Sequence, residues 1–420
     1  MDADIIIIGG GASGYAAAIT AMETCPAAKV IIAEKLSRTG KKILATGNGK
    51  CNLSNSSISE KNYHGSFNAM EFIGNSPDWY SFFTEKLGVL CVTGSEGREG
   101  GIYPRSNSAA TVLSALRLKT AELGVTEMCD TEITAITPIK NGFSLTAKNG
   151  TVLTCKRVII AAGGYAGPSF GTDGAMMRVL KDMGYTSAKI CPAVAPLKVP
   201  QEELKGLKGV RVRGRVSAMA DGKVLRSESG EIQFNENTIS GICVFNQAYL
   251  FAAHEGKLSL RLDLAPDMDE RTLADYLFKV RKQRGNCSAE ELLTGMFLKN
   301  LAIYLVKRLS DVPLSAPVKS IPDNQIRRIA SAIKALDFHV SGCASWQNSQ
   351  VTMGGIHRKC VDDSLCSKLH RGLYLCGEIL DVAGDCGGFN LQWAWSSGYI
   401  AGKNCALSLS GDRYDKSFKH

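Results

Sequence analysis

The stretch DIIIIGGGASGYAAAITAMETCPAAKVIIAEK, residues 4–35, decides the fold class. Its isoleucine run, residues 5–8, is typical of a strand buried on both faces of a parallel sheet. A glycine-rich turn, an alanine-rich helix and a second apolar strand at 29–35 follow directly. This order of strand, glycine turn, helix and strand forms a βαβ unit. We therefore predict an α/β fold with a parallel, Rossmann-like sheet.

The glycines of this turn are spaced Gly-x-Gly-x-x-Gly, which is the pattern of a dinucleotide-binding turn. The first glycine permits the tight turn, the second lets the backbone approach a pyrophosphate, and the third lets helix and strand pack closely. The helix N-terminus faces the phosphate charge. Glu34 ends the second strand and is placed to accept hydrogen bonds from ribose hydroxyls. The residues predicted to contact the dinucleotide here are Gly9, Gly11, Ala12, Ser13, Gly14, Glu34 and Lys35.

The composition is that of a globular protein. Hydrophobic residues make up 45% and charged residues 21% of the 420, which excludes wholesale disorder. The net charge of +9 is compatible with an anionic cofactor or substrate. It is too weak to indicate nucleic acid by itself, and the aromatic content of 7% does not favour a nucleic-acid surface. We expect no nucleic-acid partner and no obligate protein partner.

The cysteines and the N-terminal apolar stretch bear on location. None of the 14 cysteines lies in a CxxC motif, so we expect free thiols in a reducing cytoplasm and no zinc site. Residues 5–22 carry no charge, which is long enough for a crude membrane-helix rule. Four glycines interrupt that stretch and its flank is acidic, so we expect neither a signal peptide nor a membrane segment.

The rest of the chain predicts a discontinuous parallel-sheet domain with an insertion. Buried strands are indicated at 158–164 and 372–378, and a helix of small residues at 391–409. Alternating patterns at 210–265 favour antiparallel strands, and helical periodicity follows in three further segments, 269–284, 290–310 and 323–336. The predicted domains are 1–190 with 351–420 for the cofactor, 191–265 for an inserted β-rich domain, and 266–350 for an inserted helical domain.

A second glycine-rich motif, LCGEILDVAGDCGGFNLQ at 375–392, favours FAD over NAD as the cofactor. A strand ending in Gly377 and Glu378, then a glycine-rich turn that opens a helix, is how many flavin enzymes hold the far end of FAD. The helix start near Asn390 and Leu391 aims its dipole at the flavin pyrimidine carbonyl, where negative charge develops on reduction. We predict FAD as the cofactor.

Four stretches carry a family resemblance: IIIIGGGASG with VIIAEK, TGKKILATGNGKCNLSN (39–55), VIIAAGGYAG with FGTDGAMMRVLKDMG, and VTMGGI with GEILDVAGDCGGFNLQWAWSSGYIAG. The chain resembles the HI0933-like family of FAD-dependent oxidoreductases, which includes 3-dehydro-bile-acid Δ4,6-reductases. The resemblance implies a two-dinucleotide-binding-type FAD domain interrupted by a β-rich and a helical region. It also implies hydride transfer from NAD(P)H to a small hydrophobic C=C or enone substrate, such as a 3-oxo-Δ4,6 steroid or bile-acid derivative.

Further cofactor contacts are expected in the 39–55 stretch. Lys41 and Lys42 are predicted to neutralise the pyrophosphate, and Thr46 and Asn52 to bind the ribityl chain or ring edge. The family more often has arginine where this chain has Lys42 and Lys50, and lysine lacks the bidentate fork, so the phosphate geometry is expected to be looser. By resemblance, backbone groups at Ile133 contact adenine.

Several questions stay open on the sequence alone, the catalytic acid among them. Arg211, Arg213 and Arg215 share one strand face and suit a substrate carboxylate, a cofactor phosphate or plain solvent. Other candidates are a thiol pair at Cys51 and Cys386, and polar groups near the ring at Tyr103 and Arg105.

The missing motifs bear on the reductant. A second Gly-x-Gly-x-x-Gly after a strand is absent, so NAD(P)H is expected as a transient donor that binds weakly. The competing functions are a flavin-bearing RNA-modifying or RNA-binding protein and a slow-turnover flavoprotein sensor.

Overall fold

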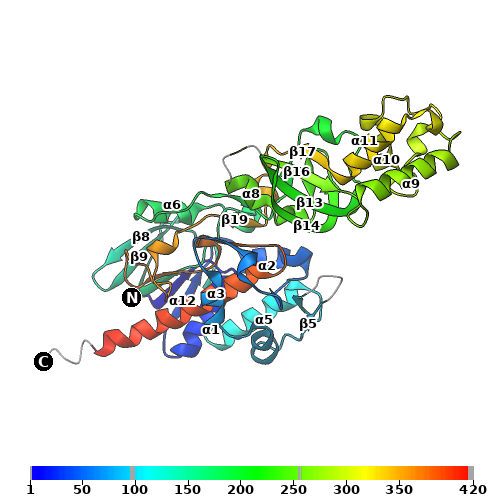
Figure 1. Cartoon of the computed structure of the whole chain (residues 1–420). Coiled ribbons are helices and arrows are strands. Elements are labelled where there is room, and N and C mark those ends of the chain that lie inside the picture. The colour runs from blue at the N-terminus through cyan, green and yellow to red at the C-terminus, as the bar shows by residue number, and fades with distance from the viewer. Residues whose placement is uncertain (1, 95–99, 254–255, 257, 415–420) are drawn as a thin grey trace. The chain divides into compact units, whose positions relative to one another are not determined.

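The computed structural model of the chain describes residues 2–94, 100–253, 256 and 258–414. It divides into two compact units (Figure 1). The first unit comprises Met1–Cys191 and Gln350–His420, and the second comprises Pro192–Ser349. The chain therefore leaves the first unit once and returns to it. The further division of the insertion into a β-rich and a helical domain stays a prediction.

The first unit is built on a 7-stranded sheet in the order β7-β2-β1-β10-β9-β8, with β20 also paired to β10. Strands β7, β2, β1, β10 and β20 run parallel to their neighbours in this group. The predicted α/β fold with a parallel sheet is confirmed. The bounds are β1 Ala3–Ile8, β2 Val30–Ala33, β7 Thr126–Met128, β8 Ile133–Ile139, β9 Gly142–Ala147, β10 Val152–Ile160 and β20 Leu373–Leu375.

Strand β10 changes partner along its length. Residues 152–155 pair antiparallel with β9, and residues 158–160 pair parallel with β20. Its other edge pairs with β1, where Ile7 lies opposite Ile159. These isoleucines are fully buried, as expected for β-branched residues in a sheet that is covered on both faces. The first and the last parts of the chain thus meet on this strand.

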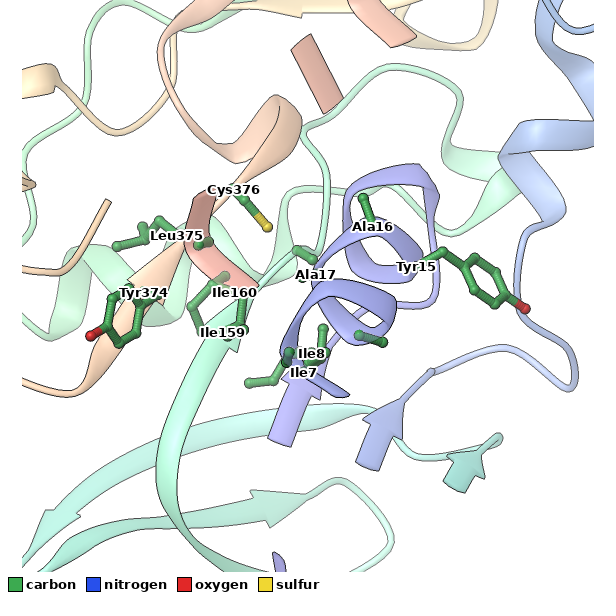
Figure 2. Packing of buried hydrophobic residues seen from close by; sticks show 14 of the residues in the cluster. Ile7, Ile8, Tyr15, Ala16, Ala17, Ile159, Ile160, Tyr374, Leu375 and Cys376 are labelled. Atoms are coloured by element: carbon green, nitrogen blue, oxygen red, sulfur yellow. The ribbon is translucent and has the colours of Figure 1, made fainter. Parts of the chain in front are cut away.

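Two helices from opposite ends of the chain, α1 (Ala12–Thr24) and α12 (Phe389–Tyr414), pack against one another. A Cβ atom on Gly398 would lie 2.4 Å from the carbonyl oxygen of Ser13, and one on Gly402 would lie 2.3 Å from that of Ala17. Only glycine permits backbones to come this close. Figure 2 shows the alanines of α1 over the isoleucines of β1 and β10, so small side chains let the helix lie close to the sheet.

Smaller elements complete the first unit. The helices are α2 Lys41–Ala45, α3 Ala69–Gly74, α4 Trp79–Ser81, α5 Ala109–Glu122 and α6 Ala175–Asp182. Two small antiparallel sheets, β21-β4 and β3-β6-β5, lie outside the main sheet. The remaining strands are β3 Ser54–Asn55, β4 Tyr63–Gly65, β5 Cys91–Thr93, β6 Gly101–Pro104, β19 Val351–Met353 and β21 Val382–Gly384, and β11 Cys191–Ala193 spans the boundary to the second unit.

The second unit has a 7-stranded antiparallel sheet in the order β17-β16-β13-β14-β15-β12-β18, and a group of helices. The strands are β12 Leu197–Lys198, β13 Arg211–Ala220, β14 Lys223–Phe234, β15 Thr238–Ser240, β16 Leu258–Asp263, β17 Leu336–His339 and β18 Gly342–Cys343. The helices are α7 Ile242–Phe245, α8 Ala248–Ala253, α9 Glu270–Gln283, α10 Lys299–Leu309 and α11 Asp323–Lys334. One apolar core runs through both parts of this unit.

One predicted helix is wrong over half its length. The sequence indicates a helix over 290–310, but α10 begins at Lys299, and residues 289–291 form a single 3₁₀ turn. Ser288 and Glu291 make a capping box on that turn, and Gly295 follows with a φ of +91°. The left-handed glycine interrupts the helical backbone, although the apolar spacing continues through it.

The uncharged stretch 5–22 forms part of β1 and of α1. Among the helices that the structure describes, none is long and apolar enough to cross a membrane.

Candidate dinucleotide site

The first glycine loop, between β1 and α1, is shaped by contacts of its own backbone. Gly9 has a φ of +107°, and a Cβ there would lie 2.5 Å from the carbonyl oxygen of Ala161. A Cβ on Gly14 would lie 2.0 Å from the carbonyl oxygen of Gly9. At Gly11, by contrast, no described atom lies within 4 Å of the Cβ position. The loop is therefore closed against its own chain and open where a ligand would approach.

The N-terminus of α1 can bind an anion. Gly11 is its N-cap, and a glycine has no side chain that could cap the first turn. The amides of Ala12 and Ser13 lie in that turn, where helical N–H groups have no partner within the helix. Such a helix start is suited to phosphate, because its N–H groups point outward and its dipole is positive.

Glu34, directly after β2, is held rigidly beside this loop. Its Oε2 accepts a hydrogen bond from the Gly10 amide at 2.9 Å, and its Oε1 accepts one from the Leu36 amide at 2.9 Å. Each carboxylate oxygen keeps a further lone pair for a ribose hydroxyl. The Thr131 amide donates to the Glu34 carbonyl at 2.8 Å, so the strand that begins at Ile133 starts beside Glu34. Ile133 itself is buried, and its contact with adenine stays a prediction.

Three of the other predicted contacts have different surroundings. The Lys35 ammonium forms an ion pair with Asp173 at 2.8 Å. The Thr46 hydroxyl donates to the Ile43 carbonyl at 2.6 Å, at the end of α2. Lys41 is exposed at the start of α2. The first two side chains thus already serve the protein's own structure, and Lys41 keeps its charge toward solvent.

Lys42 and Glu378, predicted as separate cofactor contacts, bind each other. Lys42 Nζ lies 2.7 Å from Glu378 Oε2 and donates to the Ala166 carbonyl at 3.0 Å. Glu378 Oε1 accepts from both the amide and the hydroxyl of Thr352, at 3.0 and 2.8 Å. Because Glu378 neutralises Lys42 locally, a pyrophosphate would meet a paired lysine there.

Gly377 brings the two motifs together. It has a φ of +78°, and a Cβ there would lie 2.4 Å from the Ser13 hydroxyl oxygen. Its amide donates to Ser397 Oγ at 2.9 Å, and its carbonyl accepts from Trp393 Nε1 at 3.1 Å. The start of α1 and the second glycine motif, which are far apart in the sequence, are therefore neighbours.

The second glycine loop, Gly384–Gly388, is held by side chains. Asn390 Oδ1 accepts from the Gly384 amide at 2.8 Å, and its Nδ2 donates to the carbonyls of Gly384 and Asp385 at 2.8 and 3.2 Å. All three bonds shape the loop, so Asn390 acts on a ligand through the loop. Leu391, the next residue of α12, is half-buried.

Asn52 provides the clearest open hydrogen-bonding position. Its side chain is buried, and its Oδ1 has no hydrogen-bond partner among the residues that the structure describes. A Cβ on Gly388 would lie 2.8 Å from this oxygen and 2.4 Å from the Ser54 carbonyl oxygen. Asn55 Nδ2 donates to the Gly387 carbonyl at 2.9 Å and fastens the two segments together. A buried acceptor without a donor fits a ligand N–H group at this position.

A histidine–aspartate pair on the second loop was not found from the sequence. His64 Nε2 lies 3.0 Å from Asp385 Oδ1, and both side chains are largely buried. The pair forms because β4 runs antiparallel to β21, which sets Tyr63 opposite Gly384. The Tyr63 hydroxyl donates to the Phe389 carbonyl at 3.1 Å. No local spacing signals this contact, because it depends on a pairing of distant strands.

A buried polar network beneath the first loop was also missed. The Tyr15 hydroxyl lies 2.7 Å from Thr39 Oγ1 and donates to Glu127 Oε1 at 2.9 Å, and burial raises the pKa of Tyr15. Thr39 Oγ1 also contacts Glu127 Oε2 at 2.7 Å, and Arg117 donates to the Thr39 carbonyl at 2.8 Å. A Cβ on Gly10 would meet Thr39 Cγ2 at 2.5 Å. The network thus supports the loop from below.

Asp381, between the two parts of the second motif, is buried. Its Oδ2 accepts from the Ser66 amide at 2.9 Å, and its Oδ1 has no partner among the described residues. Burial raises the pKa of this carboxyl above its ordinary value. Protonation of Asp381 is therefore easier in the folded chain than in the unfolded one, and this contribution to stability, present at low pH, is lost as the pH rises through the raised pKa.

Cys51 and Cys386 form no disulfide, and all 14 cysteines are free thiols. Cys51 is fully buried, and burial raises the pKa of its thiol to about 12, which makes a reactive thiolate unfavourable. Of the two polar candidates near the ring, Tyr103 is buried in β6 and Arg105 is exposed. Within the described part of the chain, no three His, Cys, Asp or Glu residues could together hold a metal ion.

The arginine face of β13 lies in the second unit. Arg211, Arg213 and Arg215 are all exposed, in agreement with their shared face. Arg211 lies 3.4 Å from Glu231 of β14, and Arg213 is directly opposite Glu231 in the strand register. A carboxylate of the protein therefore already stands beside this face.

The chain is similar to known proteins over almost its whole length. The chain is 36% identical over 409 residues to the 3-dehydro-bile acid delta(4,6)-reductase of Clostridium scindens, which covers 95% of this chain and 98% of the relative. It is 26% identical to the ribosomal RNA dihydrouridine synthase of Escherichia coli, over 97% and 99% of the two chains.

Among solved structures, the 3-ketosteroid delta1-dehydrogenase of Sterolibacterium denitrificans superposes with a TM-score of 0.52 at 14% identity, over 97% of this chain and 99% of that one. This similarity concerns the fold alone. The family described as HI0933-like protein Rossmann domain matches residues 3–404. The sequence resemblance is thereby confirmed: this chain is an oxidoreductase that belongs to the HI0933-like family.

Proposed function

We propose that the first unit binds FAD across its two glycine loops and reduces a C=C bond conjugated to a carbonyl group. Bound FAD supplies hydride acceptance and donation. The observation that carries the proposal is the pair of open positions in one unit: the clear space at Gly11 beside an anchored Glu34, and the unpaired Asn52 oxygen beside the second loop. The space at Gly11 beside Glu34 suits a pyrophosphate and a ribose. The Asn52 oxygen suits an N–H group of a ring.

In this proposal, each part of the site contacts or positions a different part of FAD. The N-terminus of α1 binds the pyrophosphate, and Glu34 accepts hydrogen bonds from the adenosine ribose. Asn52 accepts a hydrogen bond from the ring, while Asn390 holds the loop and the start of α12 in place. Lys42 and Glu378 neutralise each other, so of these two neighbouring lysines it is the exposed Lys41 whose charge can act on a phosphate.

The names of two relatives describe the same kind of reaction, the reduction of a C=C bond. A bile acid delta(4,6)-reductase saturates a C=C bond, and so does an enzyme that makes dihydrouridine. In both substrates the reduced bond is conjugated to a carbonyl, so hydride adds to the far carbon and a proton to the near one. We propose a 3-oxo-Δ4,6 steroid or a similar small hydrophobic enone for this chain. The reductant is NADH or NADPH, bound weakly and released before the acceptor binds.

The cofactor is tested by purification and by one substitution. The protein should be yellow and release FAD on denaturation. Glu34→Ala removes a charged hydrogen-bond acceptor worth about 1.5–3 kcal/mol, which lowers FAD affinity by about ten- to a hundredfold. Glu122→Ala, at an exposed glutamate on the end of α5, is the matched control and should leave FAD affinity unchanged. Equal affinity in the Glu34 variant and wild type removes this residue from the site.

The substrate is tested by anaerobic reduction followed by addition of candidate acceptors. Rapid reoxidation by a 3-oxo-Δ4,6 steroid supports the enone assignment. With weak donor binding, steady-state kinetics should be ping-pong, with competition between donor and acceptor. A stable ternary complex with tightly bound NADPH contradicts the single shared position.

A second candidate function rests on the dihydrouridine synthase relatives, which match nearly the whole chain at 26% and 24% identity. In that case a uridine in RNA is the acceptor. Reoxidation by an RNA that contains uridine, with none by the enone, would favour this function over the first. The lower identity of these relatives makes it the second choice.

A further inference from the structure

The second unit holds a cavity of about 730 Å³ at the C-terminal end of α9. Four of its lining residues are cations, and the lining includes no aspartate or glutamate of the described chain. The cations are Arg281, Lys282, Arg284 and Lys319. Such a single-sign lining attracts anions, because the cations repel one another until a counter-charge enters.

The walls of this cavity are fixed by backbone hydrogen bonds. The Lys319 amide donates to the Gly285 carbonyl at 3.1 Å, and the Val318 amide donates to the Cys287 carbonyl at 2.8 Å. A Cβ on Gly285 would lie 3.4 Å from the Lys319 Cβ. The segment that follows α9 and the segment that carries Lys319 therefore lie side by side, so that cations from both segments line one cavity.

Most of this charge is not neutralised by the protein. Arg281 is paired with Asp323 at 2.6 Å. Lys319 contacts the neutral Asn286 oxygen at 2.9 Å, and Lys282 is exposed, with no partner among the described residues. The cavity thus holds three positive charges without a facing carboxylate in the described chain.

The guanidinium of Arg284 is anchored at one end. Its Nη1 donates to the carbonyls of Glu291 and Thr294, at 3.2 and 2.6 Å. Its Nε and Nη2 have no hydrogen-bond partner among the described residues. The two carbonyls hold one end of the guanidinium, which leaves the other two donors available as a fork.

The dipole of α9 explains part of this arrangement. Cations near a helix C-terminus are favourable, which accounts for Arg281 and Lys282 in the last turn. Lys319 belongs to a different segment, and Arg284 donates to a loop outside the helix. The helix dipole therefore does not explain why Lys319 and Arg284 line the same cavity.

We propose that this cavity is a binding site for the phosphate group of a small anionic ligand. A phosphate matches the lining because a guanidinium fork and two ammonium groups can each donate to a different phosphate oxygen. The site lies wholly within the second unit and does not depend on FAD.

Cys287 provides a built-in reporter, because this exposed thiol lines the cavity. Holoprotein is treated with iodoacetamide, and alkylation of Cys287 is followed by peptide mass spectrometry with and without inorganic pyrophosphate. Saturable protection of Cys287 is expected. In the double variant Lys282→Ala/Lys319→Ala the pyrophosphate concentration for half protection should rise at least about tenfold. Lys279→Ala, an exposed lysine of α9 outside the cavity, is the matched control and should behave as wild type.

A parallel measurement with ADP distinguishes the source of the phosphate. Protection at lower concentration by ADP than by pyrophosphate supports a nucleotide, and equal protection supports the free anion. The proposal is overturned if sulfate at matched ionic strength protects equally well, or if the double variant binds pyrophosphate as tightly as wild type. Far tighter protection by single-stranded RNA would also overturn it in favour of a macromolecular ligand. Absorbance of bound flavin, measured on the same samples, reports the first unit separately.

Discussion

The loop Gly9–Gly14 and the loop Gly384–Gly388 belong to the same unit, but different contacts hold them. In the first, the Cβ positions of Gly9 and Gly14 press against backbone of the loop itself and of the residue after β10, and the Glu34 carboxylate accepts a hydrogen bond from the Gly10 amide. In the second, the amide of Asn390, the amide of Asn55 and the pair His64–Asp385 hold the backbone. The first loop therefore depends mainly on positions that have no side chain, whereas the second depends on hydrogen bonds from particular side chains. This difference sets what each substitution should do.

The largest effect is expected at Gly14. In Gly14→Val a Cβ would lie 2.0 Å from the Gly9 carbonyl oxygen, which the backbone can relieve only by opening the turn. The free energy of unfolding should fall by more than about 4 kcal/mol, or no soluble protein should form. Urea denaturation of the purified variant measures this. A variant with wild-type stability would show that the loop is not closed on itself.

The next effect is expected at Gly388, where φ is +98° and a Cβ would lie 2.4 Å from the Ser54 carbonyl oxygen. Gly388→Ala should cost about 2–4 kcal/mol through strain and overpacking together. Gly124→Ala is the matched control, since Gly124 has a φ of +75° but no described atom within 4 Å of its Cβ position. The control should lose only the conformational part, about 1–2 kcal/mol. Equal losses in the two variants would show that packing against residue 54 does not matter.

A smaller effect is expected at Asn390. Asn390→Ala removes three hydrogen bonds and leaves backbone groups of Gly384 and Asp385 unpaired, at a cost of about 2 kcal/mol. Asn390→Asp keeps the acceptor for the Gly384 amide and loses the two donated bonds, so its stability should fall in between. Both are measured by thermal unfolding, with FAD content as a second readout. If the aspartate variant were less stable than the alanine variant, repulsion from nearby acceptors would dominate instead.

The smallest effect on stability is expected at Gly11. Its Cβ position is open and its φ of −88° suits any residue, so Gly11→Ala should cost less than about 1 kcal/mol. The added methyl group would stand where the pyrophosphate approaches, so FAD affinity should fall by at least about tenfold. Isothermal titration of the apoprotein with FAD tests this. Unchanged affinity would place the pyrophosphate elsewhere.

The same comparison explains how far the sequence leads. The strand, glycine turn and helix of the first loop could be predicted, because they and Glu34 follow one another within residues 4–35, but the Tyr15–Thr39–Glu127 network beneath the loop could not. The second loop was predicted as a motif, but its supports at Asn55 and His64 were not, since they reach it through tertiary contacts and the pairing of β4 with β21. The pairing of Lys42 with Glu378 was missed for the same reason. The helix predicted over 290–310 was wrong before Lys299, because the apolar spacing continues through the left-handed Gly295.

The close packing of α1 against α12 has a consequence for the order of events during synthesis. The ribosome makes β1 and α1 first, whereas β20, β21 and α12 come last. The second unit, residues 192–349, is complete before any of these late elements has been translated. At about 5–20 residues per second, the apolar edge of β10 waits about 10–40 seconds for β20, and the small-residue face of α1 waits about 20–70 seconds for α12. Truncation of α12 should therefore lower solubility, because it leaves the small-residue face of α1 without its partner.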